Sequence, residues 1–150
     1  MVLATATILA AGLFAGAALY INLVEHPARV ACGAEIALAE FAPSYRRATV
    51  MQASLAGVSC IAGIAAWLSL DHVALLVGGI LMGAVIPFTL LVILPTNKQL
   101  LDPALDRASP RVSALLNRWQ WLHAVRTALS LVAFVLLVWC MLTANPASNS

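Results

Sequence analysis

Four apolar stretches, each long enough to cross a lipid bilayer, dominate this chain of 150 residues. A hydrocarbon core about 30 Å thick is crossed by a helix of about 20 apolar residues. Inside lipid, only helices and closed barrels pair all of their backbone polar groups. We therefore predict an all-α integral membrane four-helix bundle, a single domain over residues 1–144. The predicted spans are about 3–24, 50–70, 73–94 and 122–142.

The composition favours lipid as the solvent. Hydrophobic residues make up 63% of the chain and charged residues 9%, whereas soluble domains are roughly half apolar and about a quarter charged. The net charge of +2 comes from scattered residues, so we expect the bilayer and no nucleic acid as a partner. Cys32, Cys60 and Cys140 are odd in number and lack CxxC spacing, which indicates neither a disulfide framework nor a zinc site.

The connections between the spans differ in length. Only Asp71 and His72 separate the second and third spans, so we predict a tight antiparallel hairpin with Asp71 capping the following helix. The first connection mixes apolar and charged residues over about 28–42, which favours a short helix at the membrane surface that ends at Pro43. Polar residues at 145–150 predict a disordered tail.

The last helix is predicted to be longer than the membrane is thick. Ser109 and Pro110 form an N-cap and first-turn pair, so the helix should run from there to about Thr143. Glycine pairs at Gly12 with Gly16, and at Gly79 with Gly83, are typical of close helix packing in membranes.

The basic residues predict the orientation of the bundle. By the positive-inside rule the two long connections face the cytoplasm, and both termini face the other side. We expect a multi-pass protein of a bacterial cytoplasmic (inner) membrane. The residues on which this depends are Arg29, Arg46, Arg47, Lys98, Arg107, Arg111 and Arg118.

Polar side chains that can carry chemistry gather at the same predicted end. Trp119, His123, Arg126 and Thr127 occupy positions i, i+4, i+7 and i+8, so they share one face of the last helix. If that face turns inward, it meets the polar ends of the other helices and could bind a flat, lipid-soluble molecule. The residues expected there are Glu25, His26, Asn97 and, deeper in the second span, Gln52.

Each of these residues also has a structural interpretation. Trp119 and Trp121 are compatible with an interfacial aromatic belt, and Arg126 with a side chain that reaches the headgroups. Glu25 could neutralise a nearby arginine, and Asn97 could cap a helix.

Three segments resemble the anthrone oxygenase-like membrane proteins, also called the domain of unknown function 1772 family. They are LFAGAALYINLVEHPAR at 13–29, LPTNKQLL at 94–101 and RWQWLHAVRT at 118–127. The resemblance implies a four-helix membrane protein, some of whose relatives oxidise anthrones to anthraquinones. The family pattern falls on Glu25, His26, Pro27, Asn97, Trp119, His123, Arg126 and Thr127.

The resemblance and the residues together favour a membrane oxygenase for a lipophilic phenolic or polycyclic substrate. His123 or His26 could remove a proton to form an enolate that reacts with O2. Arg126 and Asn97 could stabilise its oxygen, and Trp119 could stack on the rings.

Non-enzymatic interpretations stay open at this point. The same residues would suit a haem-, quinone- or metal-binding subunit, with Glu25, His26 and His123 as the candidate metal ligands. No cofactor is specified, and neither is an oligomeric state. A structural or assembly protein is the third class.

Overall fold

The computed structural model describes residues 1–143, and the predicted tail lies outside them. These residues form helices joined by turns and contain no strand, which confirms the all-α prediction. The elements are α1 (Val2–Tyr20), the π-helix η1 (Ile21–Glu25), α2 (His26–Ala31), α3 (Ala34–Leu70), α4 (Val73–Phe88), the π-helix η2 (Thr89–Ile93), α5 (Leu94–Leu100) and α6 (Pro110–Thr143).

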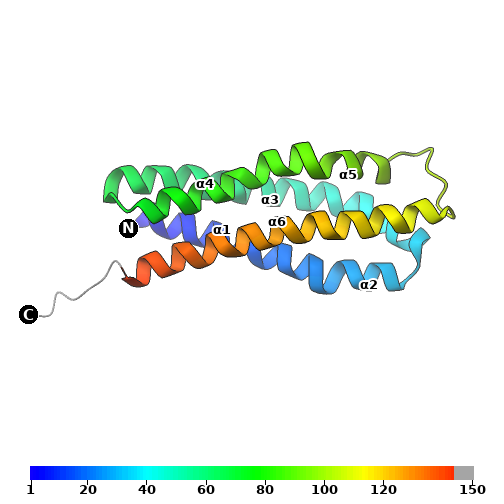
Figure 1. Cartoon of the computed structure of the whole chain (residues 1–150), viewed down its shortest axis with the longest axis horizontal. Helices are drawn as coiled ribbons and strands as arrows, with labels where there is room; N and C mark the ends of the chain where they lie inside the picture. Colours follow the sequence, from blue (N-terminus) through cyan, green and yellow to red (C-terminus); the bar gives the residue numbers. More distant parts are fainter. Residues whose placement is uncertain (144–150) are drawn as a thin grey trace, which may run out of the picture.

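Four continuous helical segments are long and apolar enough to cross a membrane. Two of them are single helices, α3 and α6, whereas α1–η1–α2 and α4–η2–α5 each continue through a π-helix. In the bundle α3 packs beside α1 and α4, and so does α6, so that α3 and α6 lie diagonally opposite (Figure 1). The predicted four-helix membrane bundle is therefore the observed fold.

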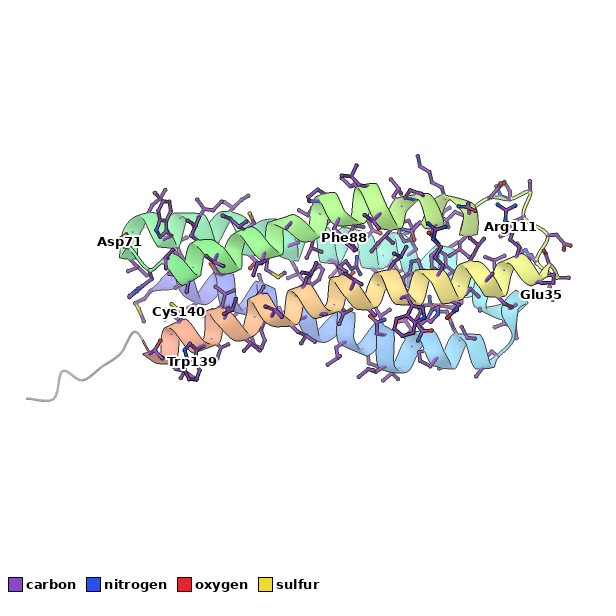
Figure 2. All side chains as sticks on the ribbon, in the orientation of Figure 1. Glu35, Asp71, Phe88, Arg111, Trp139 and Cys140 are labelled. Atoms are coloured by element: carbon purple, nitrogen blue, oxygen red, sulfur yellow. The ribbon has the colours of Figure 1, made fainter. Side chains whose placement is uncertain are left out.

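The two ends of the bundle differ. One end, which we call the polar end, holds α2, the first turns of α3, α5 and the loop from α5 to α6 (Figure 1). Glu35 and Arg111 mark it in Figure 2, whereas Asp71, Trp139 and Cys140 lie toward the opposite end. The basic residues that predict the orientation belong to the elements of the polar end or to the adjoining turns of α3 and α6.

The interior consists of two clusters of buried side chains. The larger cluster includes Phe14, Leu75, Met82 and Leu137 and lies toward the Asp71 end. The second cluster belongs to the polar end, and its members are Ile21, Ala37, Leu38, Phe41, Ile93, Leu100, Val112, Leu115, Leu116 and Trp119. Because α6 extends into the second cluster, the turns of α6 before the predicted span pack against protein.

Glycine allows a close backbone contact between α3 and α4. A Cβ atom at Gly63 would lie 2.9 Å from the Leu75 carbonyl oxygen and 3.0 Å from the Gly79 Cα atom. Small residues let helix backbones approach each other in this way. Gly79 therefore packs as predicted, whereas a Cβ atom at Gly16 would meet nothing within 4 Å.

Helix was not expected to continue past Pro27, Pro43 or Pro95, because the predicted spans end at about 24 and 94 and the predicted surface helix ends at Pro43. The structure corrects all three expectations. Pro43 lies inside α3, so the predicted surface segment at 28–42 is not a separate helix. Ala37, Leu38 and Phe41 of its second half are buried in the polar-end cluster, and this packing outweighs the hydrogen bond that a proline removes from a helix.

The other two prolines follow the π-helices. Pro27 comes two residues after η1, and Pro95 two residues after η2. In an α-helix a proline ring collides with the carbonyl group four residues before it. The wider π-turn, closed by a bond from the His26 N–H to the Ile21 carbonyl, relaxes that geometry and lets the helix continue.

The Asp71 turn is as tight as predicted, but Asp71 has a different role. It ends α3 in a left-handed conformation with φ 54°, and His72 occupies the N-cap position of α4. Aspartate adopts this conformation more readily than most residues. At the other connection the prediction is confirmed, since the Ser109 hydroxyl accepts a bond of 3.2 Å from the Arg111 N–H and α6 begins at Pro110.

Candidate functional site

A cavity lies between the two buried clusters, in the half of the bundle that contains the polar end. Its volume is about 110 Å³, within about 770 Å³ of empty space that includes its opening. The lining is mostly apolar, with a few polar groups, as in many small-molecule sites. Of the predicted site residues, the cavity wall includes Glu25, Gln52, Asn97, Trp119, His123 and Arg126.

Arg126 is a buried cation without an acidic partner. Its side chain is 8% exposed, and its guanidinium lies 5.5 Å from the Phe14 ring. Its Nη2 atom donates to Gln52 Oε1 at 2.6 Å and to His123 Nε2. The ion pairs among residues 1–143 involve Arg29 instead. The guanidinium therefore turns inward rather than reaching toward the headgroups.

His123 is held by a residue that the sequence analysis missed, Asn22. The Asn22 amide donates to the Gln120 carbonyl at 3.3 Å, so its Oδ1 atom faces α6. That oxygen lies 2.6 Å from His123 Nδ1 and accepts a hydrogen bond from the Thr127 hydroxyl, also at 2.6 Å. Because Oδ1 can only accept, His123 carries its proton on Nδ1 and presents an unprotonated Nε2 to Arg126.

Trp119 packs against both histidines. Its ring centroid is 4.6 Å from that of His123 and 5.0 Å from that of His26, and the Phe41 ring meets its edge at 5.5 Å. Trp119 is thus part of the interior, whereas Trp121 is 69% exposed on the outside of α6. The aromatic-belt interpretation therefore fits Trp121 and not Trp119.

His26 is buried but does not line the cavity. It packs against the Trp119 ring, and neither of its ring nitrogens makes a hydrogen bond of standard geometry within residues 1–143. The structure brings it into contact with the site through Trp119 alone, so a direct role for His26 stays a prediction.

Glu25 forms part of an ion-pair network that covers one side of the cavity. Arg29 pairs with Glu25 and, at 2.6 Å, with Glu40. The Ser44 hydroxyl donates to Glu25 at 2.8 Å. The prediction that Glu25 neutralises a nearby arginine is therefore confirmed.

Several buried polar atoms around the cavity have no hydrogen-bond partner among the residues that the structure describes. They are the Asn97 Oδ1, Gln52 Nε2, Trp119 Nε1 and Arg126 Nε atoms. Asn97 is 1% exposed inside α5, which argues against a helix-capping role. Buried polar groups are nearly always paired, so such atoms call for a bound molecule or ordered water.

The candidate metal ligands do not converge. No group of three or more His, Cys, Asp or Glu side chains able to hold a metal ion occurs within residues 1–143. Glu25 is engaged by Arg29 and Ser44, whereas His123 is engaged by Asn22 and Arg126. Glu25 and His26 are consecutive on the helix and point to different neighbours, which is why the predicted set is not brought together.

The signal for Asn22 was present in the sequence. It is a lone amide within an apolar span, and polar residues inside membrane segments are commonly functional. Its partner is on α6, 101 residues away, and that contact depends on how the first helix is rotated.

Comparison with known protein families gives a match that covers most of the chain. The family described as Anthrone oxygenase matches residues 41–136, which include Gln52, Asn97, Trp119, His123 and Arg126. No curated protein and no solved structure matches the chain at a significant level.

Proposed function

Because the chain belongs to the anthrone oxygenase family, we propose that it is a membrane oxygenase for a lipophilic phenolic or polycyclic, anthrone-like substrate. The observation that carries this proposal is the pairing of Arg126 with His123 at the cavity wall. A buried cation without an acidic partner favours an anionic ligand oxygen, and the unprotonated Nε2 atom beside it can accept a proton.

The proposed reaction begins with proton removal from the activated CH2 carbon of an anthrone. As an Arg126 N–H moves from His123 Nε2 to the forming enolate oxygen, the freed Nε2 lone pair takes this proton, and the electron pair of the C–H bond moves onto the carbonyl oxygen to give an enolate. Arg126 has an unpartnered Nε atom and uses Nη2 for both of its protein bonds, so it has donors left for the enolate oxygen.

The oxidation then requires only O2 as the co-reactant. The enolate carbon forms a bond to oxygen, and the peroxide anion takes the proton back from His123. Loss of water from this hydroperoxide breaks the O–O bond and leaves a second carbonyl, so that anthrone and O2 give anthraquinone and H2O. The carbon loses four electrons, and O2 gains them.

Turnover by substituted proteins tests this proposal. In lipid nanodiscs supplied with anthrone, we expect the wild type to consume O2 and produce anthraquinone. His123→Ala and Arg126→Ala should each lower kcat by about 100-fold or more, which is typical for loss of a general base or of a charge-stabilising donor. Arg118→Ala is the matched control, because Arg118 is exposed on the same helix.

The same samples separate chemistry from folding. The two variants should insert, purify and unfold at temperatures close to that of the wild type. If His123→Ala and Arg126→Ala lose folding in the same proportion as turnover, or retain wild-type turnover, the proposal fails.

A second candidate is a non-enzymatic subunit that binds haem or a metal ion, and the two unpartnered nitrogens of His26 favour it. An absorption spectrum and metal analysis of the purified protein distinguish the candidates. A Soret band, or stoichiometric metal that His26→Ala loses, would support ligation.

A further inference from the structure

The cavity reaches the outer surface of the bundle through one side wall, between α3 and η2. Most lining side chains are buried or half-buried, but Thr49 and Ala53 of α3 and Leu90 of η2 are exposed. Leu90 is 55% exposed. These three residues, which we call the side opening, both line the cavity and face the surroundings of the bundle.

The packing of α3 explains why the opening lies there. Gly63 and Gly79 bring α3 and α4 together toward the Asp71 end. Toward the polar end, η2 follows α4 in the chain. The α3 helix packs closely on α4 but has few contacts with η2. The α3 and α4 helices are therefore in close contact toward the Asp71 end, whereas α3 and η2 are not in close contact beside the cavity.

The neighbouring wall, between η1 and α3, is closed by charge. The Arg29, Glu25, Glu40 and Ser44 side chains bond to one another across it. A surface groove on its outer side shares Ile21, Glu25, Ser44 and Ala48 with the cavity, and the ion-pair network lies at Glu25 and Ser44 of this shared wall. A molecule crossing here would have to break an ion-pair network, whereas the side opening presents a methyl, a hydroxyl and an isobutyl group.

The apolar stretches of the chain lead us to expect the side opening at the depth of hydrocarbon. Ala53 and Leu90 lie within the predicted spans at 50–70 and 73–94, Thr49 directly precedes the first of these, and no Lys, Arg, Asp or Glu residue occurs between Ala48 and Leu70 or between Val73 and Asn97. A solute in the bilayer therefore meets this opening directly, without passing the charged polar end.

We propose that the ligand is a bilayer-dissolved phenol or enol that reaches Arg126 and His123 through the side opening between α3 and η2, at Thr49, Ala53 and Leu90. Its acidic oxygen meets Arg126, and the part of the ligand that exceeds the cavity remains in the opening, against lipid. This inference names the source of the substrate in the proposed function and rests on it for the chemistry of the ligand.

The test uses a ligand whose arrival is visible without turnover. 2-Hydroxyanthraquinone changes its visible absorption when its hydroxyl ionises, so binding at Arg126 is followed as growth of the phenolate band. The dye is dissolved in the lipid of nanodiscs that contain the full chain, and the rate of band growth is measured for the wild type and the variants.

Ala53→Trp fills the side opening, and Ala84→Trp is the matched control, because Ala84 is exposed on α4 and does not line the cavity. We expect Ala53→Trp to slow association by about ten-fold or more and Ala84→Trp to leave it within about two-fold, since a narrowed route lowers the on-rate. Leu90→Ala widens the opening and should raise the association rate. This variant tests the inference even if Ala53→Trp does not insert into the membrane.

Equal association rates in wild type, Ala53→Trp and Leu90→Ala would overturn the inference, and so would the absence of a phenolate band in the wild type. The proposed function fails independently. If the dye binds through the opening but anthrone is not oxidised, the access route stands and the oxygenase proposal does not.

Discussion

At the scale of single residues, the site is a line of hydrogen bonds across three helices. Thr127 donates to Asn22, His123 donates to the same Asn22 oxygen, and Arg126 bridges His123 to Gln52. Each hydrogen bond in this line fixes the orientation of the side chain that follows it. In the proposed reaction Asn22 is thus a positioning residue, which would act on the substrate through the His123 tautomer.

Replacing Asn22 by leucine should release that tautomer. In Asn22→Leu the Nδ1 atom loses its close acceptor and keeps only the Thr127 hydroxyl at 3.4 Å, so the imidazole can place its proton on Nε2 and no longer accept one there. We expect turnover to fall by about 10- to 100-fold, as for loss of supporting residues around a catalytic group. Asn22→Asp keeps an acceptor oxygen opposite Nδ1 and should retain more turnover than Asn22→Leu.

Nitrogen-15 NMR of labelled histidine measures the tautomer of His123 directly. A variant that is only less stable would keep the wild-type tautomer. The wild type should show the Nδ1–H form for His123, assigned with the His123→Ala variant, and Asn22→Leu should show a loss of that form. A wild-type His123 protonated on Nε2 would contradict the positioning role.

Sequence spacing predicted the α6 part of this site and missed the α1 part for a physical reason. Trp119, His123, Arg126 and Thr127 are all buried, because a helix fixes which of its own residues share a face. The direction in which the Asn22 side chain points depends on η1, because the extra residue in a π-helical turn rotates the following residues about the helix axis. Helical periodicity does not report that change.

At the scale of elements, prolines were the least predictable feature. The predicted spans end before Pro27 and Pro95, and the predicted surface helix ends at Pro43, yet helix continues past each of these prolines. The rule that proline ends a helix considers only the lost hydrogen bond and the collision of the ring with the preceding turn. In this protein, π-turns and tertiary packing compensate for both effects. The four spans, by contrast, were predictable because length and hydropathy decide them within each segment.

The α3–α4 contact supports a prediction on two glycines of one helix. A methyl group at Gly63 would press on the Leu75 carbonyl, whereas one at Gly57 would meet nothing within 4 Å. Gly63→Ala should therefore lower the unfolding temperature. Gly57→Ala should hold or raise it, since alanine in a helix is more favourable than glycine by about 0.5–1 kcal/mol.

Thermal unfolding in one detergent measures both variants, with the wild type as reference. Equal shifts of the same sign in Gly57→Ala and Gly63→Ala would mean that helix propensity, and not the close backbone approach, decides the outcome.

At the scale of the whole molecule, the distribution of charge distinguishes the two ends. Seven of the eight Lys and Arg residues lie in or beside the polar-end connections, and Arg126 is the eighth. The Asp71 turn has no Lys or Arg residue. Since basic connections are retained in the cytoplasm, we propose that the polar end is cytoplasmic and that the side opening therefore lies toward the inner leaflet.

A native cysteine allows this orientation to be measured. Cys32 is exposed in the turn between α2 and α3, at the polar end. In a Cys60→Ala, Cys140→Ala background, a membrane-impermeant maleimide should leave Cys32 unlabelled in intact spheroplasts and label it after permeabilisation. A cysteine at His72, exposed at the opposite end, should label in intact spheroplasts once Cys32 is replaced by serine.

If all copies of the chain have the same orientation, only one of the two cysteines is labelled in intact spheroplasts. Labelling of Cys32 and protection of the cysteine at position 72 in intact spheroplasts would invert the bundle, and a bilayer-dissolved substrate would then meet the side opening from the outer leaflet. Because the opening lies beside hydrocarbon in either case, the route to Arg126 depends on the packing of α3 against α4 and η2, and not on the orientation.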